Sequence, residues 1–226
     1  IAKMVGTKRH AAQDRVPQAR ITKIWNIPQW GTKELAHLDL LSDILASGKT
    51  SRFYKRLVYE DQIATRASAY YSDGEIGSQF IIEADVKPGV NISEVEKALD
   101  EELAKVLKSG VTEKELKKVK SQFFAGFIRG IERIGGFGGK SDILAQNMVY
   151  GGSPDYYKTY QKFIAETTPA DIKNAANKWL SDGVFILEIH PYPPYATVTS
   201  DVDRKTVPQA GESPEVKFPD VQKDKL

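Results

Sequence analysis

The sequence predicts a fold of the α+β class. Three observations lead to this prediction: strand-like alternation near the N-terminus, a hairpin signal in the middle of the chain, and long helical periodicity that leads to one last strand. Of the 226 residues, 41% are hydrophobic and 27% are charged. This composition is ordinary for a globular protein and is sufficient for a sizeable core.

The N-terminal part is predicted to contain one strand. Residues 1–15 are polar and show no period, so we interpret them as a lead-in segment. Residues 18–28 are rich in β-branched side chains and end at a proline. Their alternation around Ile21, Ile24 and Ile27 is typical of a strand.

Two helices are predicted next. Leucine and isoleucine recur every three or four positions from Leu35 to Leu45. Gly48 ends this helix, because glycine accepts the left-handed conformation without a steric penalty. Ser51 can cap the following helix, whose apolar face includes Phe53.

A β-hairpin is predicted after these helices. Two candidate strands, residues 63–72 and 76–86, flank the dipeptide Asp73-Gly74. This dipeptide favours a tight hairpin turn, in which the central residues have positive φ. Alternate apolar residues of the second strand share one face: Phe80, Ile82, Ala84 and Val86.

From Ile92 onward the periodicity is mainly helical. Ser93 is a candidate cap for one helix, and Thr112 with Glu115 forms a capping box for the next. The second of these helices is predicted to bury a stripe at helical spacing: Leu116, Val119, Phe123, Phe127 and Ile131.

The remaining elements follow a glycine-rich interruption at Gly135–Gly139. A helix is predicted for residues 141–150, and Ser153-Pro154 and Thr168-Pro169 each mark the start of another. The last predicted strand is Val184–Ile189.

The domain is predicted to occupy residues 16–192. Residues 193–226 are rich in proline and show no helical or strand period, so we expect them to form an extended interdomain linker. Because the chain begins with Ile1 rather than Met, we expect a mature form or an excised piece.

Composition also narrows the function. The net charge of +2 gives no field that would favour nucleic acid or an anionic membrane. The absence of cysteine excludes disulfides, thiolate metal sites and cysteine nucleophiles. No apolar run approaches the ~20 residues that a membrane-spanning helix needs.

Metal binding by this chain is not expected. The three histidines, His10, His37 and His190, are not spaced to share one helical face. Glu34 and His37 form a single E-x-x-H pair, and the second pair that a di-metal bundle would need is missing. A solvated or partly buried helix histidine is the favoured interpretation of His37.

Two groups of residues are weak candidates for binding. The first is the glycine cluster, which allows close approach of a peptide or acts as a hinge: Gly135, Gly136, Gly138 and Gly139. A kink between two packed helices is the favoured interpretation of that cluster. The second group can line a cleft, although aromatic residues at helical spacing more often pack a core: Tyr150, Tyr156, Tyr157, Tyr160 and Trp179.

Five strings between Arg15 and His190 resemble a known family: VPQARITKIWNIP, LDLLSDILASGKTSRFYKRLVYEDQIA, GVTEKELKKVKSQFFAGF, GGFGGKSDILA and TPADIKNAANKWL. They are similar to the second domain of a half of the pitrilysin/insulinase-type zinc metallopeptidases, the inverzincins. The resemblance implies a two-layer α/β sandwich of the LuxS/MPP-like type, in which a mixed, mostly antiparallel sheet carries helices on one face. It also implies that two such domains form a half, and that two halves close around a peptide.

The catalytic motif of that family, H-x-x-E-H, is absent from this chain. The substrate-clamping Arg and Tyr of the opposite half fall here at Val58 and Thr65, which cannot stabilise an oxyanion as Arg and Tyr do. The resemblance therefore implies the second, non-catalytic domain of the catalytic half of a fused, two-half zinc protease.

Several expectations about the parent protein follow from this resemblance. Zinc belongs to the parent protein and not to this fragment, and the fragment alone is inactive. Its partners are a preceding zinc domain, a following second half and a peptide substrate, in a bacterial protein that is periplasmic or otherwise exported. Two alternatives remain: a scaffold subunit of the same family that has lost catalysis, and an unrelated α/β ligand-binding domain.

Overall fold

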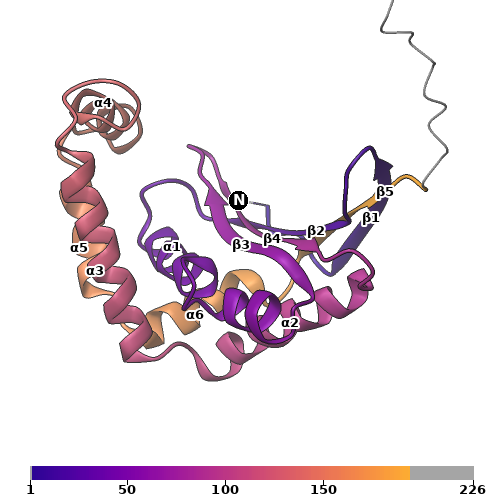
Figure 1. Ribbon diagram of the computed structural model, residues 1–226. Helices are drawn as coiled ribbons and strands as arrows, with labels where there is room; N and C mark the ends of the chain where they lie inside the picture. The colour runs from indigo at the N-terminus through magenta and orange to yellow at the C-terminus, as the bar shows by residue number, and fades with distance from the viewer. Residues whose placement is uncertain (1, 194–226) are drawn as a thin grey trace, which may run out of the picture. The chain divides into compact units, whose positions relative to one another are not determined.

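The computed structural model describes residues 2–193 and contains one five-stranded sheet in the order β1-β5-β2-β4-β3 (Figure 1). The strands are β1 (Thr7–Asp14), β2 (Arg20–Ile27), β3 (Ala64–Ser72), β4 (Ser78–Val86) and β5 (Val184–Pro191). The pair β1–β5 is parallel, and the other three pairs are antiparallel. The predicted linker, residues 193–226, lies outside the described residues except for Pro193.

The helices form the second layer. They are α1 (Lys33–Ala46), η1 (Tyr54–Glu60), α2 (Ile92–Ser109), α3 (Glu113–Gly130), α4 (Lys140–Gly151), α5 (Tyr157–Glu166) and α6 (Pro169–Leu180). Helices α1, α2 and α6 cover one face of the sheet, α3 and α5 pack on α1, and α4 lies at the far end of α3 (Figure 1). This arrangement confirms the predicted sandwich. None of the helices in residues 2–193 has both the length and the apolar character that crossing a membrane requires.

The N-terminal segment differs from its prediction. Residues 1–15, expected to be a lead-in, contain strand β1, which pairs with β5 from Thr7 opposite Val184 to Asp14 opposite Pro191. Seven of the eight side chains of β1 are exposed. An edge strand is held by backbone hydrogen bonds on one side and needs no apolar face, so periodicity could not reveal it.

Strand β2 places an unexpected residue in the core. Ile21, Trp25 and Ile27 are buried as alternation requires. The inward position between Ile21 and Trp25 is occupied by Lys23, which is only 4% exposed. Its ammonium group pairs with Asp100 and lies 3.4 Å from Glu96 Oε1. Ile24 therefore lies on the opposite face, and its predicted grouping with Ile21 and Ile27 is wrong.

The predicted hairpin is present, with a longer connection. Ser72 pairs with Gln79, and the loop at residues 73–77 replaces a two-residue turn. Gly74 therefore does not need the left-handed φ expected of it and does not have one. The four residues predicted to share the buried face of β4 are all 2% exposed or less: Phe80, Ile82, Ala84 and Val86.

The segment after α1 is a π-helix rather than an α-helix. Ser51 precedes this helix, but its predicted capping role is wrong: its hydroxyl donates to Gly48 O at 2.7 Å, and η1 has no side-chain cap. From Tyr54 the turns widen, and η1 ends at Glu60. Phe53 and Leu57 are nevertheless fully buried, so the predicted apolar face is confirmed.

Capping explains where three later helices begin. Asn91, not Ser93, caps α2, because Asn91 Oδ1 accepts from Ser93 N at 3.0 Å. The predicted capping box of α3 is present: Glu115 N lies 3.2 Å from Thr112 Oγ1, and Thr112 N donates to Glu115 Oε2 at 2.8 Å. Thr168 starts α6 as predicted.

Two helix predictions need correction. Helix α5 starts at Tyr157, after a turn at residues 154–156, and not at Ser153-Pro154. Along α3 only Leu116 and Val119 are buried, whereas the three later residues of the predicted stripe are half-buried: Phe123, Phe127 and Ile131. Figure 1 gives the reason, since the C-terminal half of α3 extends beyond the sheet.

Candidate functional site

The histidines lie on three different elements. His10 is exposed on β1, His37 is buried in α1, and His190 lies on β5 with Nε2 3.0 Å from Glu188 Oε2. Burial lowers the pKa of His37, which favours the neutral ring. In the part of the chain that the structure describes, no three or more His, Asp or Glu side chains are grouped to hold a metal ion.

Glu34, the partner of His37 in the E-x-x-H pair, is engaged elsewhere. Its carboxylate accepts from Lys178 Nζ at 2.6 Å and from Trp179 Nε1 at 3.0 Å. These contacts tie α1 to α6, and Trp179 does not line a cavity with Tyr157 and Tyr160 as expected. The structure thus gives Glu34 and Trp179 a packing role.

Val58 and Thr65 lie at the junction of η1 and β3. Val58 is half-buried, whereas Thr65 is exposed. The Thr65 hydroxyl accepts from Gln18 Nε2 at 2.7 Å and lies 3.4 Å from the carbonyl oxygen of Asp85. Both side chains serve local structure. It stays a prediction that Val58 and Thr65 exclude this chain from the substrate-clamping half of the protease.

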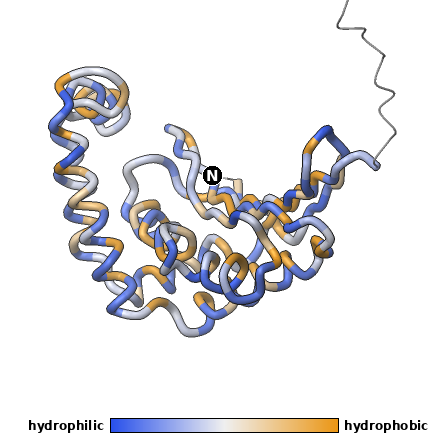
Figure 2. Tube along the Cα trace, viewed as in Figure 1, coloured by the Kyte–Doolittle hydropathy of each residue, from blue (hydrophilic) through white to orange (hydrophobic). Residues whose placement is uncertain are grey.

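The glycine cluster forms an exposed loop between α3 and α4. Gly136 and Gly138 have φ of +80° and +75°, and a Cβ on Gly139 would lie 2.7 Å from Gly135 O. Gly136, Gly138 and Gly139 are therefore needed for the turn itself, whereas no neighbour restricts Gly135. The cluster forms a loop between α3 and α4, so the favoured interpretation as a kink between packed helices is wrong. Phe137 within this loop is 97% exposed, and Figure 2 shows hydrophobic residues along the loop and α4. Binding of a peptide by the cluster stays a prediction.

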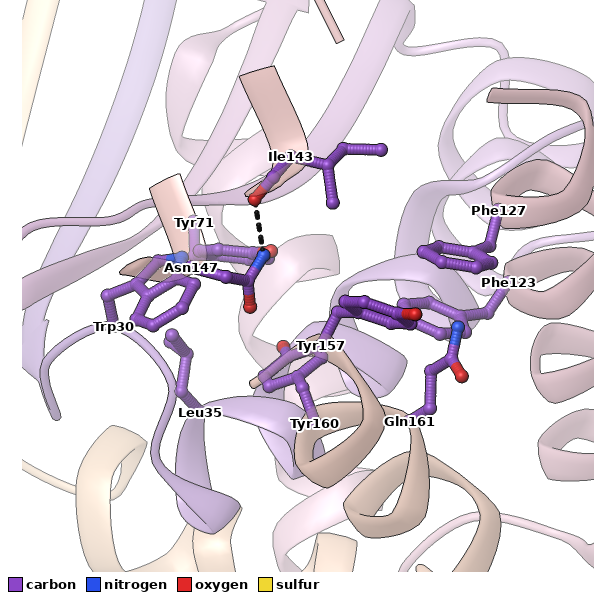
Figure 3. Close-up of a pocket in the computed structure, with 10 residues that line it drawn as sticks. All are labelled: Trp30, Leu35, Tyr71, Phe123, Phe127, Ile143, Asn147, Tyr157, Tyr160 and Gln161. Atoms are coloured by element: carbon purple, nitrogen blue, oxygen red, sulfur yellow. Dashed lines mark hydrogen bonds between the residues drawn. The ribbon is translucent and has the colours of Figure 1, made fainter. Parts of the chain in front are cut away.

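A cavity of about 150 Å³ lies where α3, α4 and α5 meet α1 and β3 (Figure 3). Six of its lining side chains are aromatic: Trp30, Tyr71, Phe123, Phe127, Tyr157 and Tyr160. Of the tyrosines that the sequence singled out, Tyr157 and Tyr160 line this cavity. The cavity is the site in the described residues with most of the features of a ligand pocket: a concave, apolar wall and a few polar groups.

Contacts between aromatic side chains hold the walls of the cavity in place. The Trp30 ring lies 5.5 Å from that of Tyr156, whose hydroxyl donates to Gly31 O at 2.9 Å. These contacts hold α5 against the connection between β2 and α1. On the other side, the rings of Phe127 and Tyr157 stack at 5.5 Å.

A carboxyl group lies behind this wall. Tyr160, through its hydroxyl, donates to Asp39 Oδ2 at 3.1 Å. Burial, together with the nearby charge of Asp43, raises the pKa of Asp39 to about 7. Burial next to Asp39 also raises the pKa values of Tyr71 and Tyr160, so both phenols stay protonated.

One amide completes the site. Asn147 on α4 is 5% exposed, and its Nδ2 donates to Ile143 O at 2.8 Å. Its Oδ1 is buried and has no hydrogen-bond partner among the described residues. Sequence reasoning missed Asn147, Asp39 and Tyr71. Only Asp39 gave a signal, as a charged residue within the apolar run of its helix.

The arrangement can bind but has no evident means of bond cleavage. Asp39 has a pKa near neutrality, as a general base needs, yet its carboxylate faces Tyr160 and is not among the groups that line the cavity. The fold and the site together define an α/β sandwich domain with a cavity lined by aromatic side chains.

The chain belongs to the family described as the peptidase M16 inactive domain, whose sequence model matches residues 5–123. This confirms the resemblance to zinc metallopeptidases. The chain is 28% identical over 159 residues to zinc protease PqqE of Helicobacter pylori, a match covering 70% of this chain and 35% of that protein.

Solved structures agree with the fold. A protease from Helicobacter pylori matches with a TM-score of 0.75 at 23% identity, covering 84% of this chain and 46% of that one. The periplasmic protease PqqL from Escherichia coli matches with a TM-score of 0.66 at 12% identity, covering 83% of this chain and 21% of that one. The chain therefore spans less than half the length of these relatives.

Proposed function

We propose that this chain is a non-catalytic structural domain of a zinc-dependent metalloendopeptidase. The observation that carries the proposal is the match of residues 5–123 to the inactive domain of peptidase M16. In this proposal zinc is held by another domain of the parent protein, which cleaves peptides with zinc-activated water. The present domain supports that zinc domain and forms part of the chamber wall.

An exposed apolar surface supports the proposed contact with the rest of the protease. It comprises large residues on the end of α3, the following loop and α4: Ile128, Ile134, Phe137, Leu144, Met148 and Val149. Several large exposed apolar residues on neighbouring elements favour an interaction surface. Since the chain spans 35% of PqqE, the remainder of such a protein is the partner to which we assign this surface.

Activity of the purified chain tests the proposal. We expect no stoichiometric zinc in calorimetric titration and no cleavage of an unstructured fluorogenic peptide, with or without added zinc. A catalytically competent M16 protease is the positive control for the peptide assay. Cleavage that a chelator abolishes and zinc restores would show that the domain is catalytic and would refute the proposal.

Assembly tests the proposed surface. The chain is expressed with the zinc-bearing domain that we expect from the same gene, and complex formation is measured by light scattering. Phe137→Ser and Val149→Ser are expected to weaken the complex at least tenfold, whereas Val5→Ser, at an 85% exposed site on neither α3 nor α4, leaves it unchanged. Equal affinity for all three variants would exclude this surface.

A scaffold subunit that has lost catalysis is the alternative from another class. The gene sequence encoding residues before Ile1 distinguishes the two: H-x-x-E-H there supports the protease, and a preceding domain without that motif supports the scaffold. For localisation we propose the periplasm or another exported compartment, supported by the structural likeness to periplasmic PqqL.

A further inference from the structure

We propose that the aromatic cavity binds the side chain of a tyrosine in a peptide. This assignment rests on the proposed function, because a protease chamber is what would bring an unfolded peptide to this wall. It adds a side-chain specificity that membership of the family does not supply. Three features carry it: the size of the cavity, the chemistry of its wall and the unpaired oxygen of Asn147.

The size of the cavity matches one six-membered ring. Its volume of about 150 Å³ is that of engineered protein cavities that bind benzene. The wall is made of aromatic faces and edges from Trp30, Phe123 and Tyr157, which favour a flat ring in offset or edge contact (Figure 3). A space of this size accommodates a phenyl or phenol ring.

Asn147 distinguishes between those two rings. Because Nδ2 donates to Ile143 O, the amide cannot be turned around, and Oδ1 is fixed as the acceptor without a donor (Figure 3). A phenol hydroxyl supplies a donor at the end of an apolar ring, whereas phenylalanine leaves Oδ1 unpaired. Neighbouring side chains cover Oδ1 in the free protein, so a phenol reaches it only when a side chain that lines the cavity moves.

A cation is disfavoured at the same position. Asp39 is the nearby carboxyl, but its Oδ2 accepts from Tyr160 and it is not among the groups that line the cavity. Its raised pKa also leaves it partly protonated near pH 7. Lysine and arginine side chains would thus lose hydration without gaining an ion pair.

Titration of the full chain with capped amino acids tests the assignment. We expect N-acetyl-tyrosinamide to bind with Kd of about 1 mM, a value typical of so small a ligand. N-acetyl-phenylalaninamide is expected to bind about tenfold more weakly, and N-acetyl-lysinamide not to saturate. At saturation the side-chain amide resonance of Asn147 should shift more with the tyrosine ligand than with the phenylalanine ligand, because only the phenol donates to Oδ1.

Two variants and one control make the test specific. Asn147→Leu removes the acceptor and is expected to abolish the preference for tyrosine over phenylalanine. Asn177→Leu is the control, because Asn177 makes the same contact to the carbonyl four residues earlier, at 2.9 Å, outside the cavity. Ile143→Trp fills the cavity and should abolish binding of both ligands, which keeps the test decisive if Asn147→Leu does not fold.

Three results would overturn the assignment: equal affinity of the parent chain for tyrosine and phenylalanine, saturable binding of the lysine ligand, or a tyrosine preference that survives in Asn147→Leu. None of these measurements uses zinc or a second domain. A chain that binds tyrosine but does not assemble with a zinc domain would therefore refute the proposed function and leave the cavity assignment intact.

Discussion

Replacing Asp39 by Asn should stabilise the protein at alkaline pH but not at acidic pH. Burial raises the pKa of Asp39 from an ordinary value of about 3.9 to about 7. The folded state therefore keeps the Asp39 proton after the unfolded state has lost it. The stability contributed by this proton is complete below about pH 4 and is lost as pH rises through 7.

The size of the effect follows from that shift. Three pKa units correspond to about 4 kcal/mol, which is the upper limit for the loss of stability between pH 4 and pH 8. Asp39 is half-buried, so hydration and relaxation reduce this figure, and we expect about 2 kcal/mol. Asn removes the ionisation but keeps an oxygen that can accept from the Tyr160 hydroxyl, now 3.1 Å from Asp39 Oδ2.

Urea unfolding followed by tryptophan fluorescence at pH 5 and pH 8 measures the difference. The advantage of Asp39→Asn over the parent chain should grow by about 1.3 kcal/mol from pH 5 to pH 8, since about a third of the change is complete by pH 5. Asp14→Asn, at an exposed carboxyl on β1, is the control and should show no such growth. An advantage that is the same at both pH values would refute the assignment of a raised pKa to Asp39.

Two further predictions concern stability. Burial alone would raise the pKa of Glu115, but hydrogen bonds from Arg52 and Thr112 outweigh it and hold that pKa at about 2. Glu115→Gln should therefore destabilise the chain at pH 7 by up to about 3 kcal/mol, a deficit that disappears as pH falls from about 4.5 to 2 in urea titrations. Phe80 is fully buried, so Phe80→Ala should lower the unfolding free energy by about 3–5 kcal/mol, whereas Tyr70→Ala, on the exposed face of the same hairpin, should cost less than about 1 kcal/mol in the same assay.

Local signals explain which elements could be predicted. The capping box at Thr112 and the alternation around Phe80 depend on neighbouring residues, so both predictions were confirmed. Strand β1 depends instead on β5, whose residue Val184 lies opposite Thr7 and far from it in sequence. Lys23 occupies a core position only because Asp100 of α2 is there to pair with it.

The candidate site was also less predictable, because it too depends on residues that are far apart in the sequence. Tyr157 and Tyr160 were noticed through their composition, but their spacing did not decide between a cleft and packing. Asn147 looks unremarkable in sequence, since the lack of a donor for its Oδ1 arises only when α3, α4 and α5 pack together. A missing hydrogen bond leaves no pattern in the sequence.

Rigidity and binding are assigned to different parts of the domain. The core residues with no exposed surface are most numerous on α1 and also lie on β2, α2 and α6, whereas α4 contributes only Asn147 to the buried set. The same helix carries exposed apolar residues, among them Met148 and Val149, and one wall of the cavity. Segments with few buried contacts open and rearrange most readily. Helix α4 can thus adjust to a ligand or to a neighbouring domain while the sheet keeps its geometry, as the proposed role in a chamber wall would require.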